Sequence, residues 1–132
     1  MIFLDANILV SAILGTHTKQ ALRAALARDV DLGVTEAQLV EAESVLVRTL
    51  GLSRERAIEA LEAIARLVLV APEAFYATYE PAARARLHAR GQPDWPVLAA
   101  ALAADGGVWS HDRDFFGIGA PLWSTRNIKF AM

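Results

Sequence analysis

Aspartates follow two short apolar runs that lie near opposite ends of the chain. Residues 1–4 run directly into Asp5, and residues 107–111 run into Asp112. Both runs are typical of buried strands of a parallel sheet, and ligands of α/β proteins bind at the carboxyl ends of such strands. Carboxylates that meet at this edge must take up protons or share a cation. The pattern therefore predicts a metal-dependent catalytic site.

Three more acids are placed to join the same edge. Glu41 lies one to two turns into a helix expected after a strand at residues 31–35, and Asp94 begins a strongly apolar helix. Mg²⁺ and Mn²⁺ prefer carboxylate and water oxygens, and such an ion could activate a water molecule and stabilise the leaving oxygen of a phosphodiester. We predict that one crevice holds Mg²⁺ or Mn²⁺ through the catalytic residues Asp5, Glu41, Asp94 and Asp112, with Asp114 as a further metal ligand.

These acids also have structural interpretations. Asp5 and Asp94 each precede an expected helix and could serve only as its N-cap, and Asp114 could cap the loop around it. A residue can cap a helix and still offer an oxygen to a metal, so the two interpretations do not exclude one another.

Glu41 has two neighbours that compete for the same role. Glu36 lies in the first helical turn, where a negative charge suits the helix dipole without any catalytic purpose. Glu43 is two residues beyond Glu41 and therefore points to a different face of the helix. The residues alone leave the choice between Glu41 and Glu43 open.

Apolar periodicity, capping residues and glycine stops predict alternating strands and helices. Strands are expected at 2–5, 31–35, 67–70, 108–110 and 121–123, and helices at 6–14, 16–28, 36–50, 54–66, 81–90 and 94–104. Strands separated by helices imply parallel pairing with right-handed crossovers. We predict one α/β domain over residues 1–132, a three-layer α/β/α sandwich with a central parallel sheet of four to five strands.

The amino-acid composition indicates a globular domain and excludes several kinds of site. The chain is 55% hydrophobic and 21% charged, which indicates a globular domain, and it has no cysteine, which excludes disulfides, thiolate metal sites and cysteine nucleophiles. The net charge of −2 counts against a polycationic coat for nucleic acid but not against a nuclease. No apolar run is long enough for a membrane span and the start lacks a basic region, so we expect a cytoplasmic protein.

The ordered set of motifs resembles the PIN-domain ribonucleases over essentially the whole chain. The resemblance is carried by Asp5-Ala6-Asn7, by Glu41 within residues 39–46, by the helix start at Asp94, and by residues 109–117 followed by Trp123-Ser124-Thr125. It implies acids that hold Mg²⁺ or Mn²⁺ for RNA hydrolysis, and the spacing from Glu41 to Leu46 favours Glu41. Many small bacterial members are toxins neutralised by a cognate antitoxin, so an antitoxin partner and a homodimer are expected.

Other residues near the expected crevice have supporting roles. Asn7 and Ser110 are predicted to hold neighbouring carboxylates or backbone in place. Arg113 and Lys129 are predicted to contact the phosphates of the substrate. His111 is expected at the surface. Among the aromatic residues, which could also stack on bases, Trp109 and Phe115 are expected in the core.

The leading hypothesis is therefore a metal-dependent endoribonuclease, and the alternative is an inactive PIN fold that binds RNA or serves as a scaffold. A phosphatase of the haloacid dehalogenase type also ends its first strand in Asp, but it needs a second Asp where this chain has Asn7. A response regulator needs an acidic pair and a late lysine that do not fit cleanly. Both remain minor hypotheses.

Overall fold

The computed structural model describes residues 1–132 and contains one five-stranded sheet in which every pair is parallel. The strands are β1 (Ile2–Leu4), β2 (Leu32–Thr35), β3 (Leu69–Ala71), β4 (Gly107–Trp109) and β5 (Leu122–Trp123). Their order is β3-β2-β1-β4-β5, so β1 is central and pairs with both β2 and β4. The predicted α/β class and parallel sheet are confirmed, with five strands.

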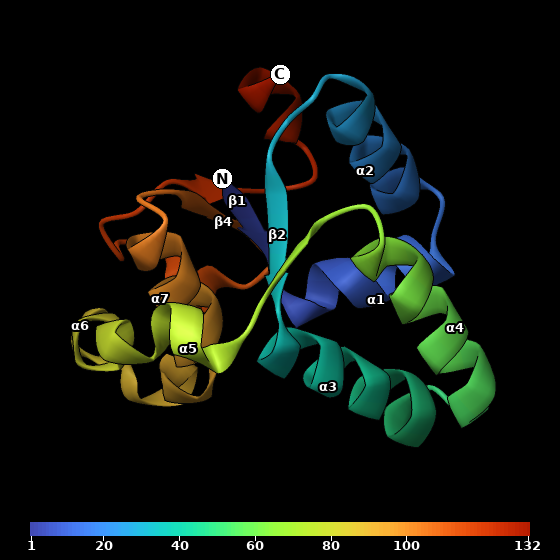
Figure 1. Ribbon diagram of the computed structural model, residues 1–132, viewed down its shortest axis with the longest axis horizontal. Coiled ribbons are helices and arrows are strands. Elements are labelled where there is room, and N and C mark those ends of the chain that lie inside the picture. The colour runs from blue at the N-terminus through green and yellow to red at the C-terminus, as the bar shows by residue number, and fades with distance from the viewer.

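Helices cover both faces of this sheet. They are α1 (Ala6–Leu14), α2 (His17–Ala27), α3 (Glu36–Ser44), α4 (Arg54–Ala65), α5 (Glu73–Tyr76), α6 (Glu80–Arg86) and α7 (Trp95–Ala103). Figure 1 shows α1, α2 and α4 on one side of β2 and α5, α6 and α7 on the other. No helix is long and apolar enough to cross a bilayer.

Alternation along the strands divides the core into two clusters. Ile2 and Leu4 point into a core shared with α1, α2, α3 and α4, whereas Phe3 between them points into a core shared with α6 and α7. Successive side chains of a strand face opposite sides, so a sheet covered on both faces is apolar throughout. This explains why β1 is a continuous apolar run that ends at the first polar residue, Asp5.

Caps define where three of the helices begin. The Asp5 carboxylate accepts a hydrogen bond from the N–H of Ala6 at 2.8 Å, Thr35 accepts one from Gln38 N at 3.0 Å, and Ser53 accepts one from Arg56 N at 3.2 Å. Each satisfies a backbone donor that the first helical turn leaves free. Asp94 occupies the same position before α7, but its side chain caps nothing. The capping interpretation is therefore correct for Asp5 and wrong for Asp94.

Several predicted boundaries are wrong. The strand predicted at 67–70 is Leu69–Ala71, because Leu67 N donates to Ile64 O and closes the end of α4. The helix predicted at 36–50 is α-helical only to Ser44 and continues as a π-helix over Val45–Thr49.

The region predicted as one helix at 81–90 is also more broken than expected. Helix α6 ends at Arg86 because Leu87 adopts an extended backbone and buries its side chain, and a 3₁₀ helix over Ala89–Asp94 follows. Helix α5 and the 3₁₀ segments Ala77–Tyr79, Arg113–Phe115 and Ile128–Ala131 were not predicted. Elements this short carry too few residues for a periodic pattern.

Candidate active site

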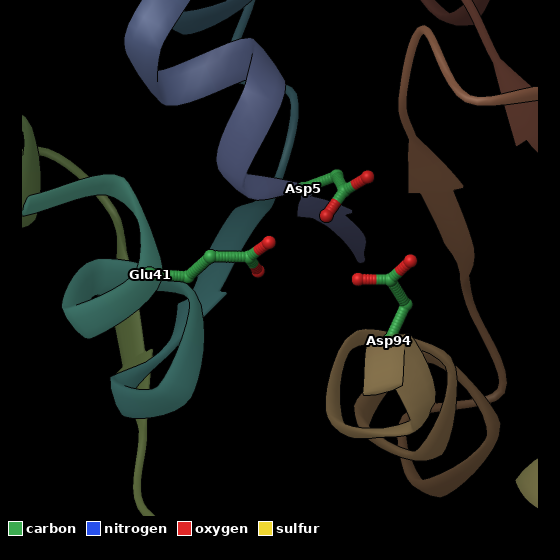
Figure 2. Close-up of side chains that lie close together, drawn as sticks. All are labelled: Asp5, Glu41 and Asp94. Carbon is green, nitrogen blue, oxygen red and sulfur yellow. The ribbon is translucent and has the colours of Figure 1, made fainter. Parts of the chain in front are cut away.

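Three carboxylates from distant parts of the chain meet at the carboxyl end of β1. One oxygen each from Asp5, Glu41 and Asp94 can be chosen so that all lie within 4.8 Å of one another. Figure 2 shows the three side chains pointing toward a common space, each from a different element. Asp5 is buried, Asp94 is partly buried and Glu41 is exposed, so the space opens to solvent on the Glu41 side.

The topology of the sheet brings these residues together. Strands β1, β2 and β4 run in the same direction, so Asp5 and the start of α3 lie at the same edge. Helix α7 precedes β4 and must run back across the sheet, which places its first turn, and Asp94, at that edge too. Helix α3 contacts both α1 and α7. The edge is the one at which parallel α/β sheets bind ligands.

Asp5 is held in one orientation by three neutral donors. Its Oδ1 accepts from Ala6 N at 2.8 Å and from the Gln38 amide at 3.4 Å, and its Oδ2 accepts from the Ser110 hydroxyl at 2.7 Å. The residue is only 3% exposed. These bonds orient the carboxylate without neutralising its charge.

Gln38 joins two of the acids, a role that the sequence analysis missed. Its Nε2 lies 3.4 Å from Asp5 Oδ1 and 3.5 Å from Glu41 Oε2, while its Oε1 accepts from the Thr35 hydroxyl at 2.7 Å. The side chain is buried at 1% exposure. The available signal was its spacing, because residues three apart share a helix face and Gln38 is three before Glu41.

Replacing Gln38 with leucine should weaken metal binding by about 10- to 100-fold, because the buried donor that orients Asp5 and Glu41 is lost. Isothermal titration with Mn²⁺ measures this directly. Gln20→Leu, at an exposed position on α2, is the matched control and should bind Mn²⁺ as the unmodified protein does. Equal affinities in the two variants would show that Gln38 serves only as packing.

Ser110 and Asn7 connect the segment after β4 to Asp5. The Ser110 hydroxyl, besides donating to Asp5, accepts from Asp112 N at 2.9 Å and from the Asn7 amide at 3.3 Å. Asn7 Oδ1 accepts from His111 N at 3.2 Å. Both polar side chains therefore hold backbone and carboxylate together, and neither joins the group of three oxygens.

The structure does not bring Asp112 or Asp114 into the cluster of three. Asp112 caps the 3₁₀ turn Arg113–Phe115 by accepting from Asp114 N at 2.9 Å. Asp114 faces Arg90, whose Nη2 lies 2.7 Å from its Oδ1 and whose Nε lies 3.2 Å from both oxygens. Arg90 lowers the pKa of the Asp114 carboxyl. Asp114 is thus already paired with a cation.

Glu43 lies on another side of α3. Its Oε1 lies 3.6 Å from Arg54 Nε, and it lines a groove between α3 and α4. Glu41 is therefore the acid that α3 directs toward Asp5, and Glu43 is not.

Burial and repulsion by neighbouring carboxylates raise the pKa of all three clustered acids. Burial raises the pKa of Asp5, against the opposing effect of its hydrogen bonds. Partial burial of its carboxyl group and then the charge of Asp5 raise the pKa of Glu41, although the residue as a whole is exposed. The pKa of Asp94 rises from 3.8 to about 7, through burial and then through Asp5 and Glu41. Asp112 adds to the repulsion at each of the three.

These acids have no positive partner within the protein. No basic side chain acts to lower the pKa of Asp5, Glu41 or Asp94, and none of the three forms an ion pair. A cluster made only of oxygen ligands with uncompensated negative charge fits a hard divalent cation such as Mg²⁺ or Mn²⁺. The donor set contains no nitrogen or sulfur ligand that would favour another class of metal.

A family model described as a PIN domain matches residues 3–132. The chain belongs to the PIN domain family. PIN domains are in general metal-dependent nucleases, and this one carries its acidic cluster at the carboxyl end of the central strand. A comparison with curated protein sequences gives no significant match.

Solved structures share the PIN fold with this chain. VapBC2 from Rickettsia felis, bound to a DNA fragment from its promoter, aligns with a TM-score of 0.73 at 18% identity, over 94% of this chain and 98% of the other. FitAB bound to an IR36 DNA fragment aligns with a TM-score of 0.63 at 21% identity, over 95% of each chain. At these identities the likeness establishes the fold.

The two predicted phosphate contacts of the PIN domain lie in different places. Arg113 is exposed, forms no ion pair and lines a hollow that also includes Ser110 and Asp112. Lys129 lies in a groove between α2 and the C-terminal segment, with its Nζ 5.2 Å from the Phe130 ring centre. The hollow lined by Arg113 includes Ser110, which hydrogen-bonds Asp5, whereas the groove lined by Lys129 contains no residue bonded to the clustered acids, so we place only Arg113 near the site.

His111 is exposed but not free. Its Nε2 lies 2.7 Å from the hydroxyl of Thr125, which also accepts from the Trp109 indole at 3.2 Å. The imidazole is therefore tied to the segment after β5.

Proposed function

We propose that this PIN domain is an endoribonuclease that depends on Mg²⁺ or Mn²⁺ and hydrolyses RNA phosphodiester bonds. The observation that carries the proposal is the convergence of Asp5, Glu41 and Asp94 at one open edge without any internal counter-charge. A divalent ion held by these oxygens would supply Lewis acidity toward the phosphodiester and a lowered pKa for a water molecule.

Each acid at the site has a different role in binding the cation and the substrate. Asp5 is fixed by Gln38 and Ser110 and offers a preset carboxylate. Glu41 is exposed and can adjust to the substrate. Asp94, with a pKa of about 7, would hold a proton near neutral pH that it would release on binding a cation. Asp112 lies outside the cluster of three acids, but its negative charge also raises the pKa of each of them and would favour a bound cation.

Incubation of the purified protein with single-stranded RNA tests this function. Cleavage should need Mn²⁺ or Mg²⁺, stop with a chelator, and fall by roughly a thousandfold in Asp5→Asn, since asparagine can still cap α1 but lacks the charge. Cleavage that survives Asp5→Asn would overturn the assignment. DNA of the same sequence run in parallel determines whether RNA is preferred.

An inactive RNA-binding or scaffold module remains the alternative function. It is disfavoured by the raised pKa values, because unpaired clustered carboxylates destabilise the fold unless they bind something. Calorimetry at millimolar Mn²⁺ separates the two, since a module without a metal site would show no heat of binding.

We further propose that the protein acts as a toxin held in check by a partner protein. The VapBC2 and FitAB structures are complexes on DNA, and this chain has their fold. An apolar groove of about 260 Å³ between α1, α2 and α4 has Ile13, Leu22 and Ile64 in its wall and Lys19 and Arg23 at its rim. It would accept apolar side chains of a partner segment that also carries acidic residues facing Lys19 and Arg23. Expression alone should arrest bacterial growth, and co-expression of the adjacent upstream gene should restore it.

The predicted homodimer needs an apolar surface that the domain itself leaves exposed. The apolar residues Ala57, Leu61 and Ile64 of α4 are buried in the core of the domain and do not provide it. Exposed apolar side chains lie instead at Val40, Leu67 and Leu69. Light scattering after size-exclusion chromatography measures the mass in solution.

A further inference from the structure

A hollow of about 340 Å³ lies along the segments that follow β4 and β5, and it is connected to the acidic cluster through Ser110. It shares two residues with the site already described, since Ser110 donates to Asp5 and Asp112 accepts from the backbone of the next turn. Its far wall is formed by Phe116 and by the segment that follows β5. Because Ser110 lines the hollow and also hydrogen-bonds Asp5, a ligand in the hollow would adjoin a ligand bound at Asp5.

Phe116 forms an apolar wall that the protein itself does not cover. Its residue is 64% exposed, while Phe115 on one side is fully buried and Ile118 on the other is 2% exposed. The intervening Gly117 has a φ of 76°, which only glycine adopts without strain, and this turn directs Phe116 outward. Phe116 N donates to Arg113 O at 2.9 Å, and Arg86 donates to Ile118 O at 3.0 Å.

These hydrogen bonds fix the backbone around Phe116, so its exposed ring is held in place. Burying the ring elsewhere would gain hydrophobic free energy, yet both of its flanks are pinned in the core and keep it in solvent. The other two aromatic residues of the motif, Trp109 and Phe115, are fully buried and have no face to offer. Phe116 is therefore the member of this motif that can stack on a ligand.

Polar groups around the hollow complement a nucleotide. The Arg113 guanidinium is exposed and unpaired, so it can contact a phosphate. The Asn127 Oδ1 accepts from Ser124 N at 2.7 Å, which fixes the side chain and leaves its amide N–H₂ as a donor. A flat apolar ring, a free cation and an oriented amide match the base face, the phosphate and the base edge.

We propose that this hollow binds one nucleotide of single-stranded nucleic acid beside the scissile bond, with its base stacked on Phe116 and its phosphate near Arg113. The proposal deepens the proposed nuclease function and rests on it. Stacking on Phe116 requires an unpaired base, so the site selects single strands over duplexes. It also makes Phe116 and Asn127 the residues that set any base preference next to the cleavage point.

Binding measured without cleavage tests the site. In the Asp94→Asn background, anisotropy with a labelled single strand of about ten nucleotides should give a Kd roughly tenfold weaker for Phe116→Ala than for the parent. Phe116→Tyr should restore binding because it keeps the ring, whereas Phe116→Leu should not. Phe130→Ala is the matched control, because Phe130 is 76% exposed and lies in a groove at the opposite edge of the sheet.

The outcomes separate this inference from the function on which it rests. Equal affinities of the Phe116→Ala and Phe130→Ala proteins, or full binding by Phe116→Leu, would overturn the nucleotide site even if the unmodified protein cleaves RNA. Equal loss of single-strand and duplex binding on Phe116→Ala would also overturn it. A protein that fails to cleave but shows the Phe116 dependence would retain the site and lose the nuclease assignment. Circular dichroism checks that each variant is folded.

Discussion

Replacing Glu41 with glutamine should reduce RNA cleavage by roughly a thousandfold, while the same replacement at Glu43 should leave it within about twofold. Both residues lie on α3 two positions apart, and the substitutions are chemically identical. Glu41 brings an oxygen within 4.8 Å of oxygens of Asp5 and Asp94, whereas Glu43 lies 3.6 Å from Arg54 on another side of the helix. The pair therefore separates loss of a site carboxylate from any general effect of changing a helix acid.

Steady-state cleavage of a fluorescent RNA at saturating Mn²⁺ measures the rates, and calorimetry measures Mn²⁺ affinity of the same two proteins. Glu41→Gln should lose affinity together with rate, because one of three negative ligands is gone. Similar rates in both variants would mean that the convergence at β1 is not the reaction centre. Loss of activity in Glu43→Gln alone would mean that Glu43 is the catalytic acid of α3. That result would contradict the position of Glu43 beside Arg54.

Much of the fold could be predicted from the sequence because its elements are marked by strong local signals. The run before Asp5 is apolar at every position, which is what a strand buried on both faces requires. The regular helices α1, α2, α4 and α7 begin and end close to where caps and glycines indicate. The errors fall where tertiary packing overrides local preference, as at Leu87, whose burial ends α6 early.

The site was harder to predict than the fold, since it depends on directions that a sequence does not carry. That Asp5 and Asp94 would face one another followed from topology alone. That Asp114 would turn to Arg90 did not, because their contact joins residues 24 positions apart in irregular segments. Gln38 stands three residues after Thr35, the spacing of a capping box, which would explain both residues without any role in the site. In the structure only its backbone N–H meets that expectation, and its amide serves Asp5 and Glu41.

The acidic cluster destabilises the metal-free fold, and the same repulsion favours binding of a cation. Asp5 cannot relax away, since it is buried and carries three hydrogen bonds, so the repulsion falls on its less confined partners. Burial and this repulsion raise the pKa of Asp94 to about 7. Without a cation the site is thus protonated in part at neutral pH, and cation binding must displace that proton.

Metal affinity should therefore fall steeply with acidity. From Asp94 alone, affinity for Mn²⁺ should fall about fivefold between pH 7 and pH 6 and about fiftyfold between pH 7 and pH 5. Calorimetry in buffers of different ionisation enthalpy should also detect a proton released on binding at pH 6. An affinity that is flat from pH 5 to pH 8 would show that Asp94 is ionised throughout and that the cluster lacks the repulsion inferred for it.

The metal-free protein should show the opposite dependence on pH. The folded-state pKa of Asp94 lies above the unfolded value of 3.8, so the folded protein binds more protons between the two values. Its contribution to stability is present in full below pH 4 and is lost as pH rises through about 7. Asp94→Asn should therefore raise the free energy of unfolding at pH 8 by about 2 kcal/mol, after allowance for solvent screening of a partly exposed group.

Denaturant melts of the metal-free protein and Asp94→Asn at pH 5 and pH 8 measure this difference, which should be large at pH 8 and much smaller at pH 5. Asparagine is a good residue before a helix, so the change itself should cost little. Asp105→Asn, at the exposed opposite end of α7, is the control and should change stability equally at both pH values. Saturating Mn²⁺ should reverse the order, because it stabilises only the protein that retains Asp94. Asp94→Asn could instead be less stable than the unmodified protein at pH 8 without metal. The Asp94 carboxylate would then stabilise the fold, and the repulsion that we take as evidence for a cation site would be absent.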